Sequence, residues 1–366
     1  MRGIAIGLLL AVATGQAQTT PTTFQDLSTQ AQHAYEADNL QEAAQLFTRA
    51  VKLKSDWAEG WWALGMIHYQ LDEYPACRDA LTQMVKLDTS AAPGWALLGL
   101  CEFQTHEYDA SLEHLKKAHM LVPPRQGGAQ LLDIANYHLA QLLTRQGAFE
   151  VAQEVYLDVA LRVRNNPEMM FSAGVACLRM PMLPSGVSAD NHDVVTMAGR
   201  AFWDIAAEPP EKTEADFRAL VAKYPNFPNV HYYYGTYLAA HHPELSADQF
   251  LKELKVSPRS VPSRVQLALR YTVERRFDEA LKYAREAVAL SPESVGAQLA
   301  LGQVYQAQGN DELALVPFSE AERIDPLSPN VRMYLINTYR ALGKVADMRR
   351  ELAEYKRLKA EQPNWP

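Results

Sequence analysis

Residues 299–326 read LALGQVYQAQGNDELALVPFSEAERIDP, two apolar runs on either side of a short polar segment. The small residues Gly302 and Ala314 stand where two helices would approach closely, with larger apolar residues beside them to fill the space. Gly309 in the polar segment can adopt the positive φ that ends a helix. Pro326 stops the second run, because proline lacks an amide hydrogen and disfavours a helical residue before it. The stretch therefore predicts two antiparallel helices joined by a tight turn.

The same spacing recurs along the chain with a period of 34 residues. Pro258, Pro292 and Pro326 each close a helical pattern, one period apart. A single helix pair of this size leaves an apolar face in water, so successive pairs must stack to bury it. The other residues that recur at this interval are Trp61 and Trp95, Leu64 and Leu98, Gly65 and Gly99, Tyr271, Tyr305 and Tyr339, Ala280 and Ala314, and Ala287 and Ala321.

These residues resemble the tetratricopeptide repeat, a 34-residue helix-turn-helix unit with the pattern W-x2-L-G-x2-Y, then A-x3-F-x2-A and a closing Pro. The resemblance implies an all-α fold, a right-handed superhelical solenoid of antiparallel helix pairs, in a family that usually binds proteins or peptides. Applied to the whole chain, the pattern predicts about nine repeats. It is matched most closely by Leu301, Gly302, Tyr305, Ala314, Phe318, Ala321 and Pro326.

The pattern divides the chain into four segments. We expect a cleavable signal peptide at residues 1–17 and an N-terminal array of about four repeats at 18–166. Residues 167–191 break the register, because a single helix is followed by PMLPSGVSADNH where its partner helix should begin. A C-terminal array of about five repeats is expected at 192–366, and the charged outer face of its last repeat suits a cap.

The first residues, MRGIAIGLLLAVATGQAQ, place Arg2 before an apolar run and small residues up to Ala17 after it. This arrangement is typical of a secretory signal, and the run is shorter than the roughly 20 apolar residues that span a bilayer. We therefore expect cleavage near Ala17 and an exported protein, periplasmic or secreted, without stable membrane insertion. A buried N-terminal helix or a membrane anchor is the alternative interpretation.

Composition narrows the class of protein. The 366 residues are 48% hydrophobic, which is enough for a large core. The net charge is -8, and no basic stretch is present that would neutralise phosphates. Nucleic acid is therefore not expected as a partner. Three cysteines are too few for a disulfide scaffold or a zinc site. Cys77 and Cys101 could form a bridge in an oxidising compartment, but their use as small packing side chains is the simpler interpretation.

Signs of catalysis are missing from the sequence. It contains no H-E-x-x-H, G-x-S-x-G, G-x-x-x-x-G-K-[ST] or paired C-x-x-C motif. Acidic pairs such as Asp311 and Glu312 stand at expected helix starts, where negative charge complements the helix dipole. We therefore expect a non-catalytic chain without a cofactor or a metal site.

The resemblance implies that the first helix of each repeat lines a concave groove. The groove residues predicted on this basis are Trp62, Met66, Tyr69, Leu100, Phe103 and Tyr137. Such a cluster suits apolar or aromatic anchors of a partner segment, although packing between repeats is the alternative for each residue. A secondary candidate surface contains Tyr232 and Tyr233, from the run HYYYGTYL, and Asn337 and Arg340, which could hold an acidic group.

These observations favour a protein-interaction scaffold of the cell envelope that binds a protein or peptide. One alternative is an enzyme, or a subunit of an enzyme complex, with its site in residues 181–210 on His192, Asp193 and Asp204, because loops that interrupt a scaffold are often functional. Another is a self-associating assembly platform, which would be a homo-oligomer.

Overall fold

The computed structural model describes residues 23–122, 130–163 and 166–361. Over these residues the regular structure consists of nineteen α-helices and two short 3-10 helices, with no strand. This confirms the expected all-α repeat fold. The chain forms two compact units, residues 1–89 and 90–366, and each is described by itself. The expected signal peptide lies outside the described residues.

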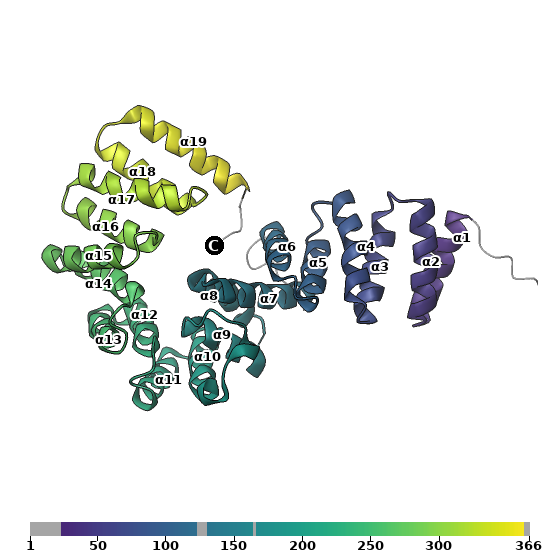
Figure 1. Ribbon diagram of the computed structural model, residues 1–366, viewed down its shortest axis with the longest axis horizontal. Helices are drawn as coiled ribbons and strands as arrows, with labels where there is room; N and C mark the ends of the chain where they lie inside the picture. Colours follow the sequence, from purple (N-terminus) through teal and green to yellow (C-terminus); the bar gives the residue numbers. More distant parts are fainter. Residues whose placement is uncertain (1–22, 123–129, 164–165, 362–366) are drawn as a thin grey trace, which may run out of the picture. The chain divides into compact units, whose positions relative to one another are not determined.

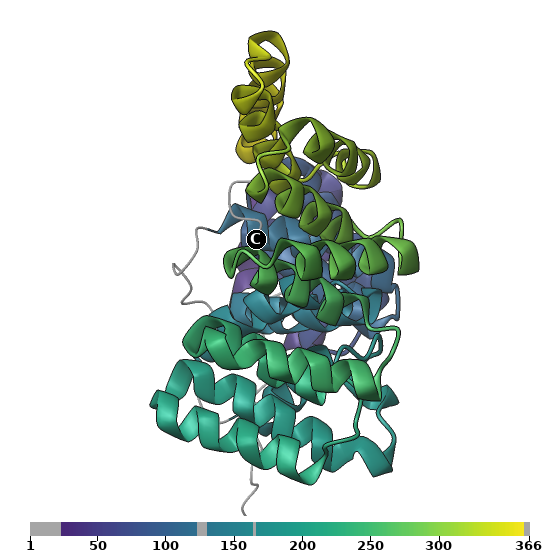
Figure 2. The same ribbon diagram turned by 90° about the vertical axis from the view of Figure 1, so that its left-hand side faces the viewer.

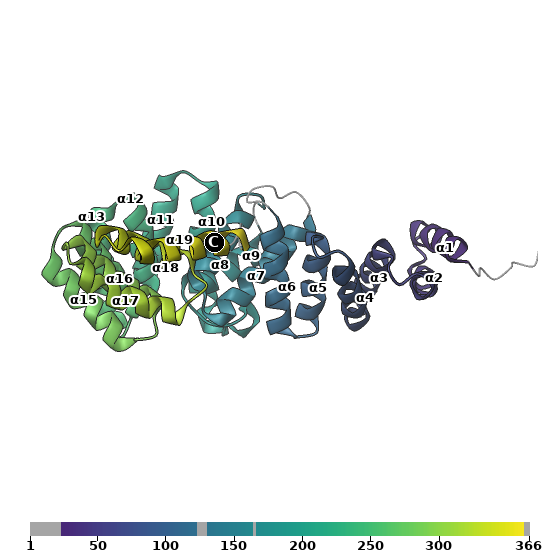
Figure 3. The same ribbon diagram turned by 90° about the horizontal axis from the view of Figure 1, so that it is seen from above.

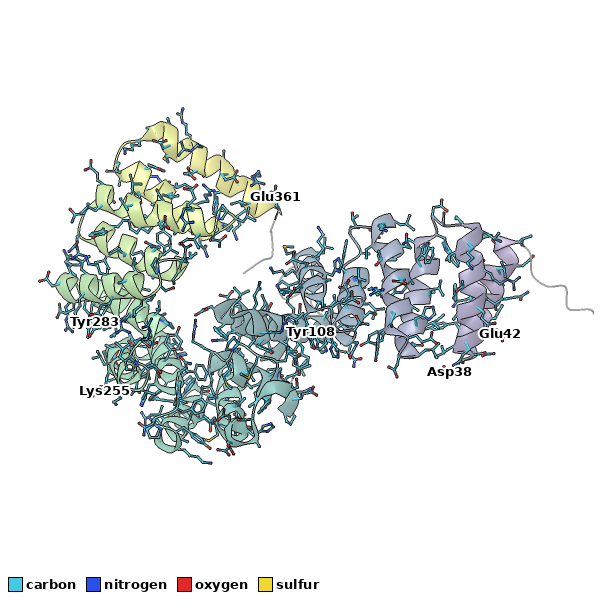
Figure 4. The ribbon with its side chains drawn as sticks, viewed as in Figure 1. Asp38, Glu42, Tyr108, Lys255, Tyr283 and Glu361 are labelled. Carbon is cyan, nitrogen blue, oxygen red and sulfur yellow. The ribbon has the colours of Figure 1, made fainter. Side chains whose placement is uncertain are left out.

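The first unit contains two helical hairpins, drawn in purple to blue in Figure 1. Its helices are α1 (Phe24–Glu36), α2 (Leu40–Leu53), α3 (Ala58–Gln70) and α4 (Tyr74–Leu87), with α1 packed on α2 and α3 on α4. The turn between α1 and α2 contains Asp38 at a φ of 57°. Just beyond it the Asn39 side-chain amide donates a hydrogen bond of 2.6 Å to Glu42, in the first turn of α2 (Figure 4).

The second unit continues with seven hairpins and one additional helix, and Figures 2 and 3 show the later hairpins side by side. The pairs are α5 with α6, α7 with α8, α9 with α10, and then α12 with α13 through α18 with α19, while α11 packs beside both α10 and α12. Its helices are α5 (Ala92–Gln104), α6 (Tyr108–Leu121), α7 (Gln130–Gln146), α8 (Phe149–Ala160), α9 (Pro167–Cys177), α10 (His192–Ala207), α11 (Pro210–Lys223), α12 (Val230–His241), α13 (Pro243–Val256), α14 (Val261–Val273), α15 (Phe277–Leu290), α16 (Val295–Ala307), α17 (Asp311–Ile324), α18 (Pro329–Ala341) and α19 (Val345–Glu361).

Small residues pack closely against large ones in several hairpins, as the spacing predicts. A β-carbon added to Gly302 would lie 2.3 Å from the ring of Phe318, which is fully buried. Gly65 faces Leu81 in the same way in the first unit, and Gly235 faces Phe250 in the second. The glycine at this place therefore admits a large side chain from the second helix of its own hairpin.

The break in the repeat register is a hairpin with a long connection. The sequence predicts no helical partner for the helix at residues 167–180, whereas the structure packs α10 against α9. Between them, residues 178–191 form a loop that includes the short 3-10 helices η1 (Pro184–Gly186) and η2 (Ala189–Asn191). The pairing is possible because Gly174 and Gly199 let the two backbones touch: a β-carbon on Gly199 would lie 1.8 Å from the Met170 carbonyl oxygen.

The three cysteines are all buried. Cys177 is a free thiol, and burial raises its pKa to about 12. In the described part of the chain, no helix combines the length and apolar character that crossing a membrane requires.

Candidate functional site

In the first unit, three of the predicted groove residues form a row on one face of α3. Trp62, Met66 and Tyr69 follow one another at spacings of four and three residues, which brings their side chains together on a helix. All three are half-buried, so each keeps part of its apolar surface in water. Burial raises the pKa of Tyr69, with a smaller contribution from Asp72. We call Trp62, Met66 and Tyr69 the α3 row.

The neighbouring Trp61 has a structural role instead. Its ring packs against the core of the first unit, and its indole nitrogen donates a hydrogen bond of 2.9 Å to the Ser55 carbonyl oxygen. The two adjacent tryptophans therefore have different surroundings, because successive residues on a helix point in different directions. Both indole side chains are half-buried, and Trp61 anchors α3 to the core and to the segment before it.

In the second unit, the predicted groove residues differ in how far their side chains are exposed. Leu100 is 2% exposed and Tyr137 is 5% exposed, so both side chains lie in the core between hairpins. Phe103 is half-buried, with its ring centre 4.3 Å from that of His138 and 5.4 Å from that of Tyr108. Of these three predicted residues, Phe103 alone keeps a partly accessible side chain.

A polar cluster next to Phe103 was not anticipated from the sequence. The Tyr137 hydroxyl lies 3.0 Å from the Ser172 hydroxyl and donates to Glu168 over 3.3 Å, and the Gln141 amide donates to Ser172 over 3.3 Å. Burial lowers the pKa of His138 to about 4, so its imidazole is neutral near pH 7, and its Nδ1 atom is buried without a hydrogen-bond partner. The polar spacing of Tyr137 and Gln141 within apolar α7 was the available signal for this cluster.

A shallow cleft of about 300 Å³ lies at the turn between α5 and α6. Tyr108 lines it (Figure 4), and its ring carries the Arg145 guanidinium at 4.9 Å from the ring centre. The His106 ring nitrogen lies 2.8 Å from the Tyr108 hydroxyl. The cleft therefore joins an aromatic ring to a cation, and Asp109 lies 3.9 Å from that cation.

The tyrosines of the secondary candidate surface belong to the core. Tyr232 is 6% exposed and Tyr233 is 3% exposed, because α11 and α13 pack on either side of α12. The Phe217 ring of α11 contacts Tyr233, with ring centres 4.7 Å apart, and also Tyr237, at 4.5 Å. The abundance of tyrosine in this helix reflects packing around Phe217.

Asn337 and Arg340, the other two residues of that surface, are both exposed on α18. The Arg340 guanidinium donates a hydrogen bond of 3.0 Å to the Asn337 side-chain oxygen. The structure thus separates this pair from the buried tyrosines, and places it on the last hairpin.

The residues of the alternative site in 181–210 do not converge. Asp193 accepts hydrogen bonds from Lys223, at 2.7 Å, and from Tyr224, and these hold its pKa below the usual value. Burial, and then the neighbouring Asp216, raise the pKa of Asp204. Asp193 and Asp204 lie three turns apart on α10, about 16 Å along its axis. Their side chains therefore serve separate local contacts.

His192 likewise contributes to packing, with its ring centre 4.5 Å from that of Phe171. Within residues 23–122, 130–163 and 166–361, no group of three or more His, Cys, Asp or Glu side chains is placed to hold a metal ion. His192, Asp193 and Asp204, the residues of the alternative site, thus make separate local contacts.

Comparison with known proteins agrees with the repeat pattern. Residues 28–92 and 265–329 match the family described as tetratricopeptide repeat. No curated protein matches the chain. Among solved structures, yeast Tom70 is similar at 12% identity over 92% of this chain and 76% of its own, with a TM-score of 0.40.

Two further structures show similarity of the same order. An ArsTM double mutant of MamA RS-1 is 17% identical over 46% of this chain and 96% of its own, with a TM-score of 0.40. The TPR domain of P58(IPK) is 14% identical over 88% of this chain and 99% of its own, with a TM-score of 0.30. The family match therefore rests on the two matched segments, whose hairpins carry the glycine and large-residue packing described above.

Proposed function

We propose that the chain is a non-catalytic scaffold that binds a segment of a partner protein on the first helices of its hairpins. The observation that carries this proposal is the α3 row. Trp62, Met66 and Tyr69 are large and mostly apolar, and all three stay partly in water on one face of a single helix, beside the buried Leu64 and Ile67. A partner that covers them gains apolar burial at about 25 cal/mol per Å².

The chemistry of the row defines the kind of partner. Two aromatic rings offer rigid contact area, and aromatic residues dominate the binding energy at many interfaces. Met66 adds an adaptable side chain that can fit more than one shape. The row therefore favours a segment with exposed leucine, methionine or aromatic side chains over a strongly charged ligand.

The second unit offers a separate surface of similar character. Phe103 is partly accessible beside a His138 that is neutral near pH 7 and beside the aromatic ring of Tyr108. We propose that this surface also binds an apolar or aromatic segment. Each surface is tested by its own variant, because each belongs to its own unit.

The proposal for the first unit predicts that Trp62→Ala with Met66→Ala lowers recovery of bound proteins at least about 5-fold, since two central anchors are lost. The measurement is capture from envelope extract with quantitative mass spectrometry. Leu53→Ala, which removes an exposed leucine of α2 elsewhere in the same unit, serves as the matched control. Circular dichroism and the thermal midpoint establish that each variant is folded.

Unchanged recovery by a folded Trp62→Ala, Met66→Ala variant would contradict binding at the α3 row. Phe103→Ala is measured in parallel for the second unit. Light scattering of the wild type over a range of concentrations addresses the assembly-platform alternative, because self-association would appear as a mass that rises with concentration.

A further inference from the structure

In each earlier hairpin of the second unit, one face is covered by the helix that follows it in the chain. The last hairpin, α18 with α19, presents the equivalent face. In the preceding hairpin, Phe318 of α17 packs against Tyr334 of α18, with ring centres 5.2 Å apart, and Leu315 joins the same apolar cluster. One period later, Arg349 and Leu352 of α19 take the places of Leu315 and Phe318. Among the described residues, α18 is the helix with which α19 makes its extensive contact.

This face is rich in cations that have no carboxylate partner. Residues 326–346 contain no Asp or Glu, although the whole chain has 43 such residues and a net charge of -8. Arg340, Lys344, Arg349 and Lys356 are exposed, and no carboxylate of the described residues lies within ion-pair distance of them. We define the end face as Asn337, Arg340, Lys344, Arg349, Leu352 and Lys356.

The opposite flank of α19 behaves differently. Arg350 is paired with Asp347 at 2.8 Å, and Arg357 is paired with Glu354 at 2.5 Å and with Glu361 at 2.6 Å. Figure 4 marks Glu361 at the end of this helix. The flank toward α17 thus neutralises its own charges, whereas the flank away from α17 leaves them uncompensated.

The contact between α17 and α18 indicates which charge a partner residue needs in order to pair with the end face. There Glu322 of α17 forms an ion pair with Arg332 of the next first helix. One period later the place of Glu322 is taken by Lys356, so the charge on the scaffold side is reversed. A helix that stacks on the end face as α18 stacks on α17 would therefore need an acidic residue where α18 has Arg332.

The apolar side chains of the end face favour a helix as its binding partner over a membrane or a nucleic acid. Leu352 is half-buried, and Met333 of α18 is 41% exposed; one period earlier, Phe318 and Leu299 take their places and belong to one apolar cluster. In the internal contacts, residues at such places pack against the apolar stripe of the next helix. Ridges of one helix fill grooves of the other in this kind of packing, which a membrane or a nucleic acid would not reproduce.

We propose that the end face docks an acidic amphipathic helix of a partner protein, stacked on α18 and α19 as the first helix of a further hairpin would be. The apolar stripe of that helix covers Leu352 and Met333. Its flanking carboxylates meet Arg349, Lys356 and Arg340. This surface is distinct from the α3 row, and its function does not depend on binding there.

The test uses the full chain and a labelled synthetic helix of about 20 residues that carries a leucine stripe flanked by glutamates. A scrambled isomer of the same composition, without the stripe, is the control peptide. Fluorescence anisotropy measures both affinities. Arg349→Glu with Lys356→Glu is expected to weaken binding of the striped peptide at least about 10-fold at low salt, and added salt is expected to weaken the wild-type complex.

Lys255→Glu with Arg259→Glu gives the matched control, because it makes the same charge change at two exposed cations of the second unit far along the chain from α19 (Figure 4). This variant is expected to bind the striped peptide like the wild type. Circular dichroism establishes the fold of both variants, whose altered side chains are exposed.

Four results would overturn the proposal. Equal affinity for the scrambled isomer would show that binding depends on net charge alone. Equal weakening by the control variant would show that binding does not take place at the end face. Binding to anionic lipid vesicles that needs Arg349 and Lys356, without binding of the striped peptide, would assign the face to a membrane. Self-association abolished by Arg349→Glu with Lys356→Glu, again without peptide binding, would assign it to a second copy of the chain.

Discussion

At the scale of the residue, the turns within hairpins show how one backbone requirement is met in different ways. Gly309 adopts the positive φ predicted for it, at 76°, whereas the equivalent turn before α15 has Arg275 at a φ of 57°. An L-residue other than glycine costs about 1–2 kcal/mol in this region. The turn geometry is therefore kept even where the favourable residue is absent.

His138 illustrates a residue whose environment sets its charge. Its folded pKa of about 4 lies below the ordinary value near 6.5, because burial disfavours the imidazolium. The neutral form is favoured in the folded state, so its contribution is complete above about pH 6.5 and is lost as the pH falls toward 4. We expect the free energy of unfolding to drop by on the order of 3 kcal/mol across this window.

The measurement is urea denaturation at pH 7 and at pH 4.5 for the wild type and for His138→Gln, which keeps a neutral polar side chain. The variant is expected to lose this part of the pH dependence, while the dependence due to carboxylates remains in both proteins. An identical pH profile for the two proteins would show that His138 is not the titrating group.

At the scale of the element, the α9–α10 hairpin depends on contact between two backbones. Gly174 and Gly199 face each other across the crossing, and a β-carbon on Gly174 would lie 2.1 Å from the Val195 carbonyl oxygen. Backbone atoms cannot turn aside as a flexible side chain can, so added volume must push the helices apart. The pairing of these two helices, despite the long connection, rests on this crossing.

Gly199→Ala is therefore expected to lower the free energy of unfolding by on the order of 3 kcal/mol, well above the usual effect of a small substitution. Gly296→Ala in α16 is the matched control, because that glycine is exposed and an added β-carbon would meet only the Ser294 hydroxyl at 4.0 Å. The control is expected to change the free energy of unfolding by less than about 1 kcal/mol, because Gly296 lies in the first turn of α16. Equal effects of the two substitutions on urea midpoints would refute the backbone crossing.

At the scale of the whole molecule, stability is built from contacts between neighbouring hairpins within each unit. Such a design spreads the core along the chain and leaves long helical faces available to partners. The net charge of -8 keeps most of the chain acidic, and the uncompensated cations of the end face stand out against it. Binding surfaces of different chemistry can therefore coexist on one scaffold.

Export also belongs to this scale, and we propose that the chain is secreted or periplasmic on the basis of residues 1–17. Expression in a Gram-negative host followed by intact-mass measurement is expected to show a chain that lacks these residues and lies in the periplasmic fraction. Arg2→Glu is expected to slow export, because the positive n-region is altered. Recovery of the uncleaved chain in the cytoplasm would contradict the proposal.

The 34-residue period, the turns and the small-against-large packing could be read from the sequence, because they arise between residues close together in the chain. Gly302 and Phe318, for example, are only 16 positions apart and belong to one hairpin. Local patterns of this kind carry their own packing partners with them. The all-α repeat fold was therefore determined by the sequence.

The accessibility of individual side chains was decided by the tertiary structure alone. Trp62 and Leu100 occupy comparable first helices, yet the first is half-buried and the second is covered. The burial of Tyr233 by Phe217 and the pairing of α9 with α10 likewise depend on residues from other elements. The exposure of a side chain depends on which residues of other helices pack against it. The helical period of the sequence does not specify those residues.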